Sequence, residues 1–179
     1  MSKDLTLLLA GFGGQGLLFA GKVAAYAGLM DGKEISWLPS YGPEMRGGTA
    51  NCSVTISETP IGSPLIMNPS ALIVMNLPSY DKFIGSAAPG ATVLIDSTMI
   101  DKKTDRTDID AHYIPATALA EENGMKGLAN IILLGKLLKE TGFTSLESMN
   151  AAIGKCVSAK HADLLELNKK AILIGMNSK

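Results

Sequence analysis

Glycines crowd one short stretch near the amino terminus of this 179-residue chain. The segment Gly11-Phe12-Gly13-Gly14-Gln15-Gly16 matches the pattern G-x-G-x-x-G. Glycines let the backbone turn tightly and come close to a ligand. Unpaired amides at the start of a helix then favour an anion such as a phosphate. The pattern predicts a phosphate site if a strand precedes it and a helix follows. The alternative is a tight strand-to-helix turn that binds nothing.

A second stretch rich in glycine and proline runs from residue 39 to residue 48 and contains Tyr41, Glu44 and Arg46. Glycines next to Arg46 leave its guanidinium free to hold a phosphate or a carboxylate through two hydrogen bonds. Glu44 would orient Arg46 or accept a ligand hydroxyl, and Tyr41 would either pack or contact the ligand. The alternative is a plain loop in which Glu44 and Arg46 form a surface ion pair worth about 0–1 kcal/mol.

Periodic segments flank both stretches and would position them. Residues 4–10 are an apolar run typical of a buried strand, residues 15–30 have apolar positions at helical spacing, and residues 34–38 indicate a second strand. This order predicts a βαβ unit, the usual opening of a parallel sheet. Both glycine-containing stretches would emerge at the carboxyl edge of that sheet, where open α/β sheets bind ligands.

The rest of the chain continues the same alternation. Strands are predicted at residues 51–57, 71–76, 91–96 and 112–115. Helices are predicted at residues 78–85, 116–123, 128–140, 145–157 and 158–174, the last with Ser158 as its N-cap. Residues 101–110, which mix aspartates with basic residues, predict a solvated loop. We therefore expect one domain over residues 1–179 with a three-layer α/β/α fold. Its sheet would be Rossmann-like, mostly parallel and possibly mixed, and its C-terminal third helical.

Composition limits the partners of this chain. Its formal net charge is −1, so no global field favours nucleic acid or an anionic membrane. Charged residues make up only 18% against a typical value of about 25%, which suggests that a partner covers part of the surface. Residues 128–138 are apolar over more than one helical face. Such a helix is buried within its domain or by another subunit.

Several classes of site lack the residues they need. Cys52 and Cys156 are too few for an iron–sulfur cluster, which needs about four thiolates, and a disulfide between them is improbable. Neither His112 nor His161 has a second ligand at helical spacing, so no metal is expected. No nucleophile–base set is evident, and we expect no catalytic residue in this chain. Glu34 lies at the beginning of the second strand rather than at its end, which disfavours a nicotinamide dinucleotide.

No apolar stretch is long enough to span a bilayer. The first ten residues have an acidic residue where a signal peptide is basic, and glycines interrupt the apolar run that follows. We therefore expect a cytoplasmic protein.

Several motifs together resemble one protein family, the gamma subunits of 2-oxoacid:ferredoxin oxidoreductases. They are Gly11–Gly16, Trp37–Gly48, the strand from Asn51, Ile61–Pro64, Ala71–Asn76 and the helical segment at Asn130. The likeness covers nearly the whole chain in order, and Ser40–Gly48 is its most specific part. That segment is more similar to the 2-oxoglutarate and branched-chain (ketoisovalerate) enzymes than to the pyruvate enzymes, and indolepyruvate enzymes stay open.

The resemblance implies a function that the residues alone do not give. Such complexes, known from anaerobic metabolism, convert a 2-oxoacid, coenzyme A and oxidised ferredoxin to acyl-CoA, carbon dioxide and reduced ferredoxin. Thiamine diphosphate and [4Fe–4S] clusters would lie on companion alpha, beta and delta-type subunits, so this chain alone would be inactive.

The gamma subunit would share in the coenzyme A site. The residues expected there are Gly11, Gly13, Gly14, Gln15, Gly16, Tyr41, Glu44, Arg46, Asn76 and Asn130. The rival hypotheses are a free-standing Rossmann-type nucleotide-binding oxidoreductase and an interface scaffold without a ligand. The isolated chain is also a candidate homodimer.

Overall fold

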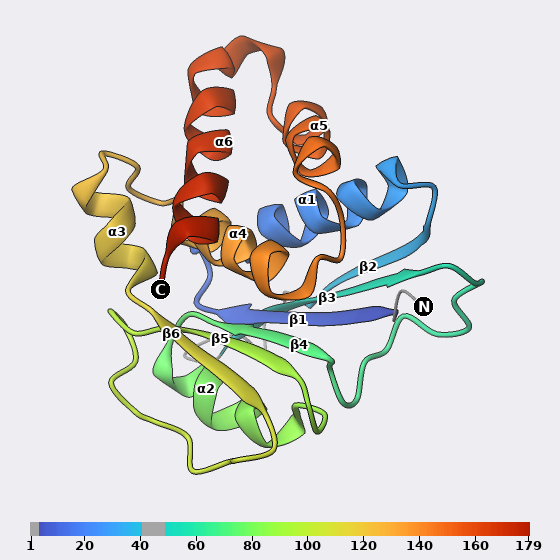
Figure 1. The fold of residues 1–179 in the computed structure, drawn as a ribbon, viewed down its shortest axis with the longest axis vertical. Coiled ribbons are helices and arrows are strands. Elements are labelled where there is room, and N and C mark those ends of the chain that lie inside the picture. Colours follow the sequence, from blue (N-terminus) through green and yellow to red (C-terminus); the bar gives the residue numbers. More distant parts are fainter. Residues whose placement is uncertain (1–3, 41–48) are drawn as a thin grey trace.

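The structure is a computed structural model that describes residues 4–40 and 49–179. One sheet of six strands runs through it, in the order β2-β3-β1-β4-β5-β6 (Figure 1). The strands are β1 (Leu5–Gly11), β2 (Glu34–Ser40), β3 (Ala50–Ser57), β4 (Ala71–Val74), β5 (Thr92–Asp96) and β6 (Asp110–Ile114). Every strand predicted from the sequence is present, with ends within a few residues of the predicted ones.

Strand directions explain how the sheet is wound. The neighbours β1–β4, β4–β5 and β5–β6 are parallel, while β3 is antiparallel to both β1 and β2. The sheet is therefore mixed, which is one of the two arrangements expected from the sequence. The predicted βαβ unit is wrong in one respect: β1 and β2 run in the same direction, but β3 lies between them. The β2–β3 connection, residues 41–49, is shorter than the dozen or more residues that a parallel crossover needs.

Helices cover both faces of the sheet (Figure 1). One face carries α1 (Leu17–Met30), α4 (Ala129–Thr141), α5 (Leu146–Cys156) and α6 (Ala162–Asn177). The other carries α2 (Leu77–Phe83) and the 3₁₀ turn Ile84–Ser86, while α3 (Ala116–Glu122) follows β6. Strand residues alternate between two cores: Leu7 and Leu9 pack in the larger core, and Leu8 and Ala10 in the smaller one. The three-layer α/β/α arrangement is thus confirmed.

The apolar helix α4 is buried within this chain. All its residues from Ala129 to Leu138 are buried, and it packs against α6. Two glycines allow this close approach. A Cβ at Gly135 would collide with the backbone of Ile172, and a Cβ at Gly175 would collide with the backbone of Ile132. Of the two explanations for this apolar segment, burial within the domain is correct. This burial within the chain gives no support for a partner subunit that covers α4.

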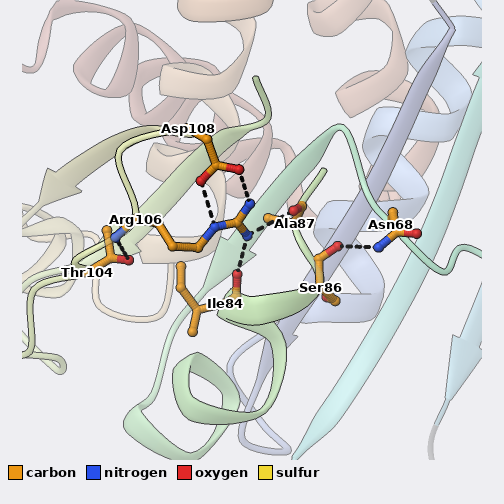
Figure 2. Close-up of polar contacts among 7 residues, drawn as sticks. All are labelled: Asn68, Ile84, Ser86, Ala87, Thr104, Arg106 and Asp108. Carbon is orange, nitrogen blue, oxygen red and sulfur yellow. Dashed lines mark hydrogen bonds and ion pairs between the residues drawn. The ribbon is translucent and has the colours of Figure 1, made fainter. Parts of the chain in front are cut away.

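The acidic and basic segment after β5 is irregular, as expected, but it is not simply solvated. Arg106 donates from Nη1 to the carbonyl oxygens of Ile84 and Ala87, both at 2.9 Å (Figure 2). Its Nε and Nη2 atoms pair with the two carboxylate oxygens of Asp108 at 2.9 and 2.6 Å. Asn68 adds a hydrogen bond to the carbonyl of Ser86. Arg106 therefore fixes the loop onto the end of the α2 layer.

Candidate ligand site at the carboxyl edge of the sheet

Strands β1 and β2 end at the same edge of the sheet, with β3 between them. Gly11, the last residue of β1, lies opposite Ala50, and Ser40, the last residue of β2, lies opposite Asn51. The glycine-rich turn and the start of the second glycine-containing stretch therefore leave the sheet at the same edge, as the sequence predicted. Tyr41, Glu44 and Arg46 lie outside the described residues.

The turn Gly11–Gly16 joins β1 to α1 and leaves amide donors open. Gly14 and Gly16 have φ values of +90° and +73°, a conformation that side chains with a Cβ rarely adopt. Among the described residues, the amides of Gly13 and Gly14 have no hydrogen-bond partner. Gly16 precedes α1 and supplies no side-chain cap to its first turn. Open donors and the positive end of the helix dipole together favour an anion here.

Gln15 braces the turn from within. Its Oε1 accepts a hydrogen bond from the amide of Phe12 at 2.6 Å, and its Nε2 donates to the carbonyl of Met75 at 3.0 Å. Its backbone amide bonds to the carbonyl of Phe12 at 3.3 Å. A Cβ at Gly11 would collide with this side chain. Gln15 and Gly11 thus shape the turn, whereas the open amides belong to Gly13 and Gly14.

The two asparagines predicted at the site are both buried and already hold backbone groups. Asn130 donates from Nδ2 to the carbonyl of Gly16 at 2.8 Å, and its Oδ1 has no partner among the described residues. Asn76 caps α2 by accepting from the amide of Ser79 at 2.9 Å, and its Nδ2 likewise has no such partner. Each residue therefore positions the edge and retains one unpaired polar atom.

Asp96 is a residue at this edge that sequence reasoning missed. It is fully buried at the end of β5, and its carboxylate accepts hydrogen bonds from the amides of Thr98 and Thr117 and, at 2.5 Å, from Oγ1 of Thr117. These bonds fix the start of α3 against the sheet. A lone aspartate at the end of a buried strand is the only signal the sequence offers.

Two hollows flank the turn and share Gly14. The first, which we call the α1 groove, has a volume of about 390 Å³ and is lined by Phe12, Gly13, Gly14, Gly16, Leu17, Leu18, Phe19 and Ala50. The second, the α3 groove, has a volume of about 240 Å³ and is lined by Gly14, Gln15, Met75, Met99, Thr117, Ala120, Glu121, Lys126, Gly127 and Ala129. A ligand phosphate at the amides of the turn would thus have apolar space on either side.

One cluster of possible metal ligands lies away from this edge. Asp110 and His112 occupy alternate positions on β6, and Glu140 comes from α4, with one ligand atom of each lying within 4.8 Å of the others. The sequence gave no hint of it because Glu140 is distant along the chain. Lys136 lies 2.8 Å from Glu140 and already neutralises its carboxylate. The cluster is therefore explained as an ion-pair network.

The two cysteines are free, and burial raises the pKa of both thiols. Cys52 is completely buried, and this burial raises the pKa of its thiol to about 11. Burial also raises the pKa of Cys156. Cys52 packs in the core as expected, close to Gly21 and Trp37. A raised pKa lowers the thiolate fraction of both residues at neutral pH, and Cys52 is in addition shielded from solvent.

A mixed α/β sheet with a glycine-rich strand–helix turn at its carboxyl edge defines a Rossmann-like fold. The family model described as pyruvate ferredoxin/flavodoxin oxidoreductase matches residues 6–178. The chain belongs to this family, which confirms the resemblance seen in its motifs. No helix in the described part of the chain is both long and apolar enough to cross a membrane.

Curated relatives carry the names expected from the motifs. Ketoisovalerate oxidoreductase subunit VorA of Methanothermobacter marburgensis is 37% identical over 175 residues, which is 97% of this chain and 36% of the relative. The chain therefore spans about a third of the length of VorA. The 2-oxoglutarate synthase subunit KorC of Methanocaldococcus jannaschii is 39% identical over 156 residues, which is 86% of this chain and 82% of the relative.

Solved structures agree with the fold. The gamma subunit of a keto/oxoacid ferredoxin oxidoreductase from Geobacter sulfurreducens superposes with a TM-score of 0.83, at 29% identity, over 96% of both chains. The 2-oxoglutarate:ferredoxin oxidoreductase of Magnetococcus marinus, solved with 2-oxoglutarate, coenzyme A and succinyl-CoA bound, superposes with a TM-score of 0.85. It is 23% identical, and the match covers 98% of this chain and 31% of that one, so it supports the fold alone.

Proposed function

We propose that this chain is the gamma subunit of a 2-oxoacid:ferredoxin oxidoreductase and contributes to its coenzyme A site. The complex would cleave a 2-oxoacid to carbon dioxide and an acyl group, pass two electrons to ferredoxin and transfer the acyl group to coenzyme A. The names of the relatives favour 2-oxoglutarate or a branched-chain 2-oxoacid as substrate. The single observation that carries a ligand role for this chain is the pair of open amides at Gly13 and Gly14.

The donors at the turn suit coenzyme A in particular. Its phosphates are charged in every state of the reaction, so their site needs donors that are fixed before binding. Gln15 and Asn130 fix this turn from two sides through Met75 and Gly16. Arg46, placed on the neighbouring stretch by the sequence, would add a charge-assisted contact. Asn76 and Asn130 would support the edge rather than bind directly.

The other cofactors belong on companion subunits. A [4Fe–4S] cluster needs about four thiolates, and this chain has two cysteines, of which Cys52 is fully buried. Thiamine diphosphate and the clusters, which together supply decarboxylation and electron transfer, would thus be held by alpha, beta and delta-type subunits in the cytoplasm. This chain binds and orients coenzyme A and carries no catalytic residue.

Coenzyme A affinity in the assembled complex tests the proposal. Arg46→Ala should weaken apparent affinity about ten- to a hundredfold, since a charge-assisted hydrogen bond contributes about 1.5–3 kcal/mol. Gly13→Val should be worse, because its side chain blocks the approach of the phosphate. Release of carbon dioxide in the first half-reaction should be unchanged. Unaltered coenzyme A affinity in both variants would reject a role for this chain in the site.

Co-purification separates the rival hypotheses. A tag on this chain should bring down thiamine- and cluster-containing partners. A free-standing nucleotide-binding oxidoreductase would instead run alone. That alternative is further disfavoured because β2 ends at Ser40, whereas Glu34, the acidic residue of this strand, lies at its opposite end, away from the turn.

A further inference from the structure

The α3 groove carries a charged side chain that the proposed function does not use. Among the described residues that line the two grooves beside the turn, Lys126 is the only cation. It is exposed and makes no ion pair with another described residue. Its neighbour on the same rim, Glu121, is also unpaired in the described part of the chain. The ammonium of Lys126 thus lies on the rim of a groove that begins at Gly14, one of the two residues with open amides.

The backbone holds Lys126 in place. Gly124 and Gly127 have φ values of +68° and +90°, so the chain turns sharply on both sides of the lysine. The amide of Met125, a buried residue, bonds to the carbonyl of Ala120 at 2.7 Å, and the amide of Leu128 bonds to the carbonyl of Met125 at 3.0 Å. This short turn is therefore anchored rather than free to swing away.

The same segment is tied directly to the glycine-rich turn. It continues into α4, whose second residue, Asn130, bonds to the carbonyl of Gly16 at 2.8 Å. Lys126 thus lies four residues from a fixed contact with the turn and lines a groove that begins at Gly14. Between them the floor is apolar, formed by Met75, Met99, Ala120 and Ala129.

We propose, resting on the coenzyme A role proposed above, that the α3 groove takes the 3′-phosphoadenosine end of coenzyme A and that Lys126 binds its 3′-phosphate. The diphosphate takes the open amides of Gly13 and Gly14. The apolar floor suits the flat adenine ring. The 3′-phosphate is a monoester with close to two negative charges near neutral pH, which suits a flexible, strongly charged ammonium.

Glu121 gives the proposal a second, opposite test. A carboxylate on the rim of the groove repels the same phosphate that the ammonium of Lys126 attracts. Removing each charge therefore has opposite effects on coenzyme A and little effect on 3′-dephospho-coenzyme A, which lacks that phosphate. A purely structural role of either residue would change the affinity for both ligands equally.

The experiment compares the affinities of the tagged, purified complex for coenzyme A and for 3′-dephospho-coenzyme A by calorimetry. Lys126→Gln should weaken coenzyme A about tenfold or more and leave the dephospho ligand unchanged. Glu121→Gln should strengthen coenzyme A alone. Lys160→Gln, an exposed lysine that lines neither groove, is the matched control and should change neither affinity.

The outcomes separate this inference from the function on which it rests. If Lys126→Gln weakens both ligands equally, or neither, the 3′-phosphate assignment is overturned. If the 3′-phosphate assignment is overturned but Gly13→Val still abolishes binding of both ligands, the coenzyme A role of the chain stands without Lys126. If Gly13→Val leaves both affinities intact, the proposed function fails first and the assignment fails with it.

Discussion

The side-chain amide of Asn130 donates a 2.8 Å hydrogen bond to the carbonyl oxygen of Gly16, across 114 residues of sequence. This bond joins the first turn of α4 to the residue that precedes α1. Asn130 is only 2% exposed, so the bond is partly shielded from water. The shape of the glycine-rich turn thus depends on a helix from the C-terminal third of the chain.

Asn130→Asp should destabilise the fold by at least about 2 kcal/mol, because a buried acceptor replaces the donor that faces the carbonyl of Gly16. Urea unfolding measures the loss. Asn123→Asp is the matched control: Asn123 donates the same kind of bond to Leu119 but is exposed, so its replacement should change the unfolding free energy little. Equal losses for the two variants would contradict the structural role assigned to Asn130.

Gly16→Ala should cost more stability than Gly14→Ala. Both positions have positive φ, which costs a residue with a Cβ about 1–2 kcal/mol. A Cβ at Gly16 would also collide with Nδ2 of Asn130, whereas a Cβ at Gly14 would meet no atom within 4 Å. In an Asn130→Ala background this extra cost should disappear. A double-mutant cycle by urea unfolding checks the coupling, and strict additivity of the two changes would refute it.

Arg106→Ala should lower the unfolding temperature by a few degrees, because the carbonyls of Ile84 and Ala87 lose their donor (Figure 2). Arg106→Lys should rescue this only partly, since an ammonium cannot match both oxygens of Asp108. Lys102→Ala, which removes an exposed ion pair with Asp81, should have little effect. Differential scanning calorimetry of the three variants measures the order of their unfolding temperatures. An equal decrease in unfolding temperature for Arg106→Ala and Lys102→Ala would contradict the prediction.

The same ion pair predicts a pH dependence. The Arg106 guanidinium lowers the pKa of Asp108 below its ordinary value. A carboxyl group whose pKa is lowered by folding contributes stability above its unfolded pKa and loses it as the pH falls through the folded value. The stability difference between wild type and Arg106→Ala should therefore shrink between about pH 5 and pH 2. A difference that stays constant over this range would exclude the ion pair as its source.

Cys52 should resist thiol reagents in the folded protein. Burial raises its pKa to about 11, so at pH 8 roughly one thiol in a thousand is ionised even before access is considered. Cys156 is partly exposed and serves as the internal control. With a chromogenic disulfide, we expect only Cys156 to react in the native state, and slowly. In urea both thiols should react. Two rapidly reacting thiols in the native state would show that the core around Cys52 opens readily.

The sequence by itself determined the elements and their order. Hydrophobic periodicity is a local property, and it located each strand and helix, including the strand and helix on either side of Gly11–Gly16. The N-cap signal at Ser158 is similarly local: its side chain accepts a hydrogen bond from the amide of Lys160, although it caps a 3₁₀ turn ahead of α6. The two cysteines also predict that this chain holds no iron–sulfur cluster, which needs about four thiolates.

Tertiary structure decided which elements meet. An alternating strand has the same local pattern whether it pairs in parallel or in antiparallel, so nothing in residues 51–57 showed that β3 would separate β1 from β2. The bonds from Gln15 to Met75 and from Asn130 to Gly16 join positions that are distant along the chain. Such contacts depend on how the elements pack, because side chains far apart in sequence become neighbours only when the core forms.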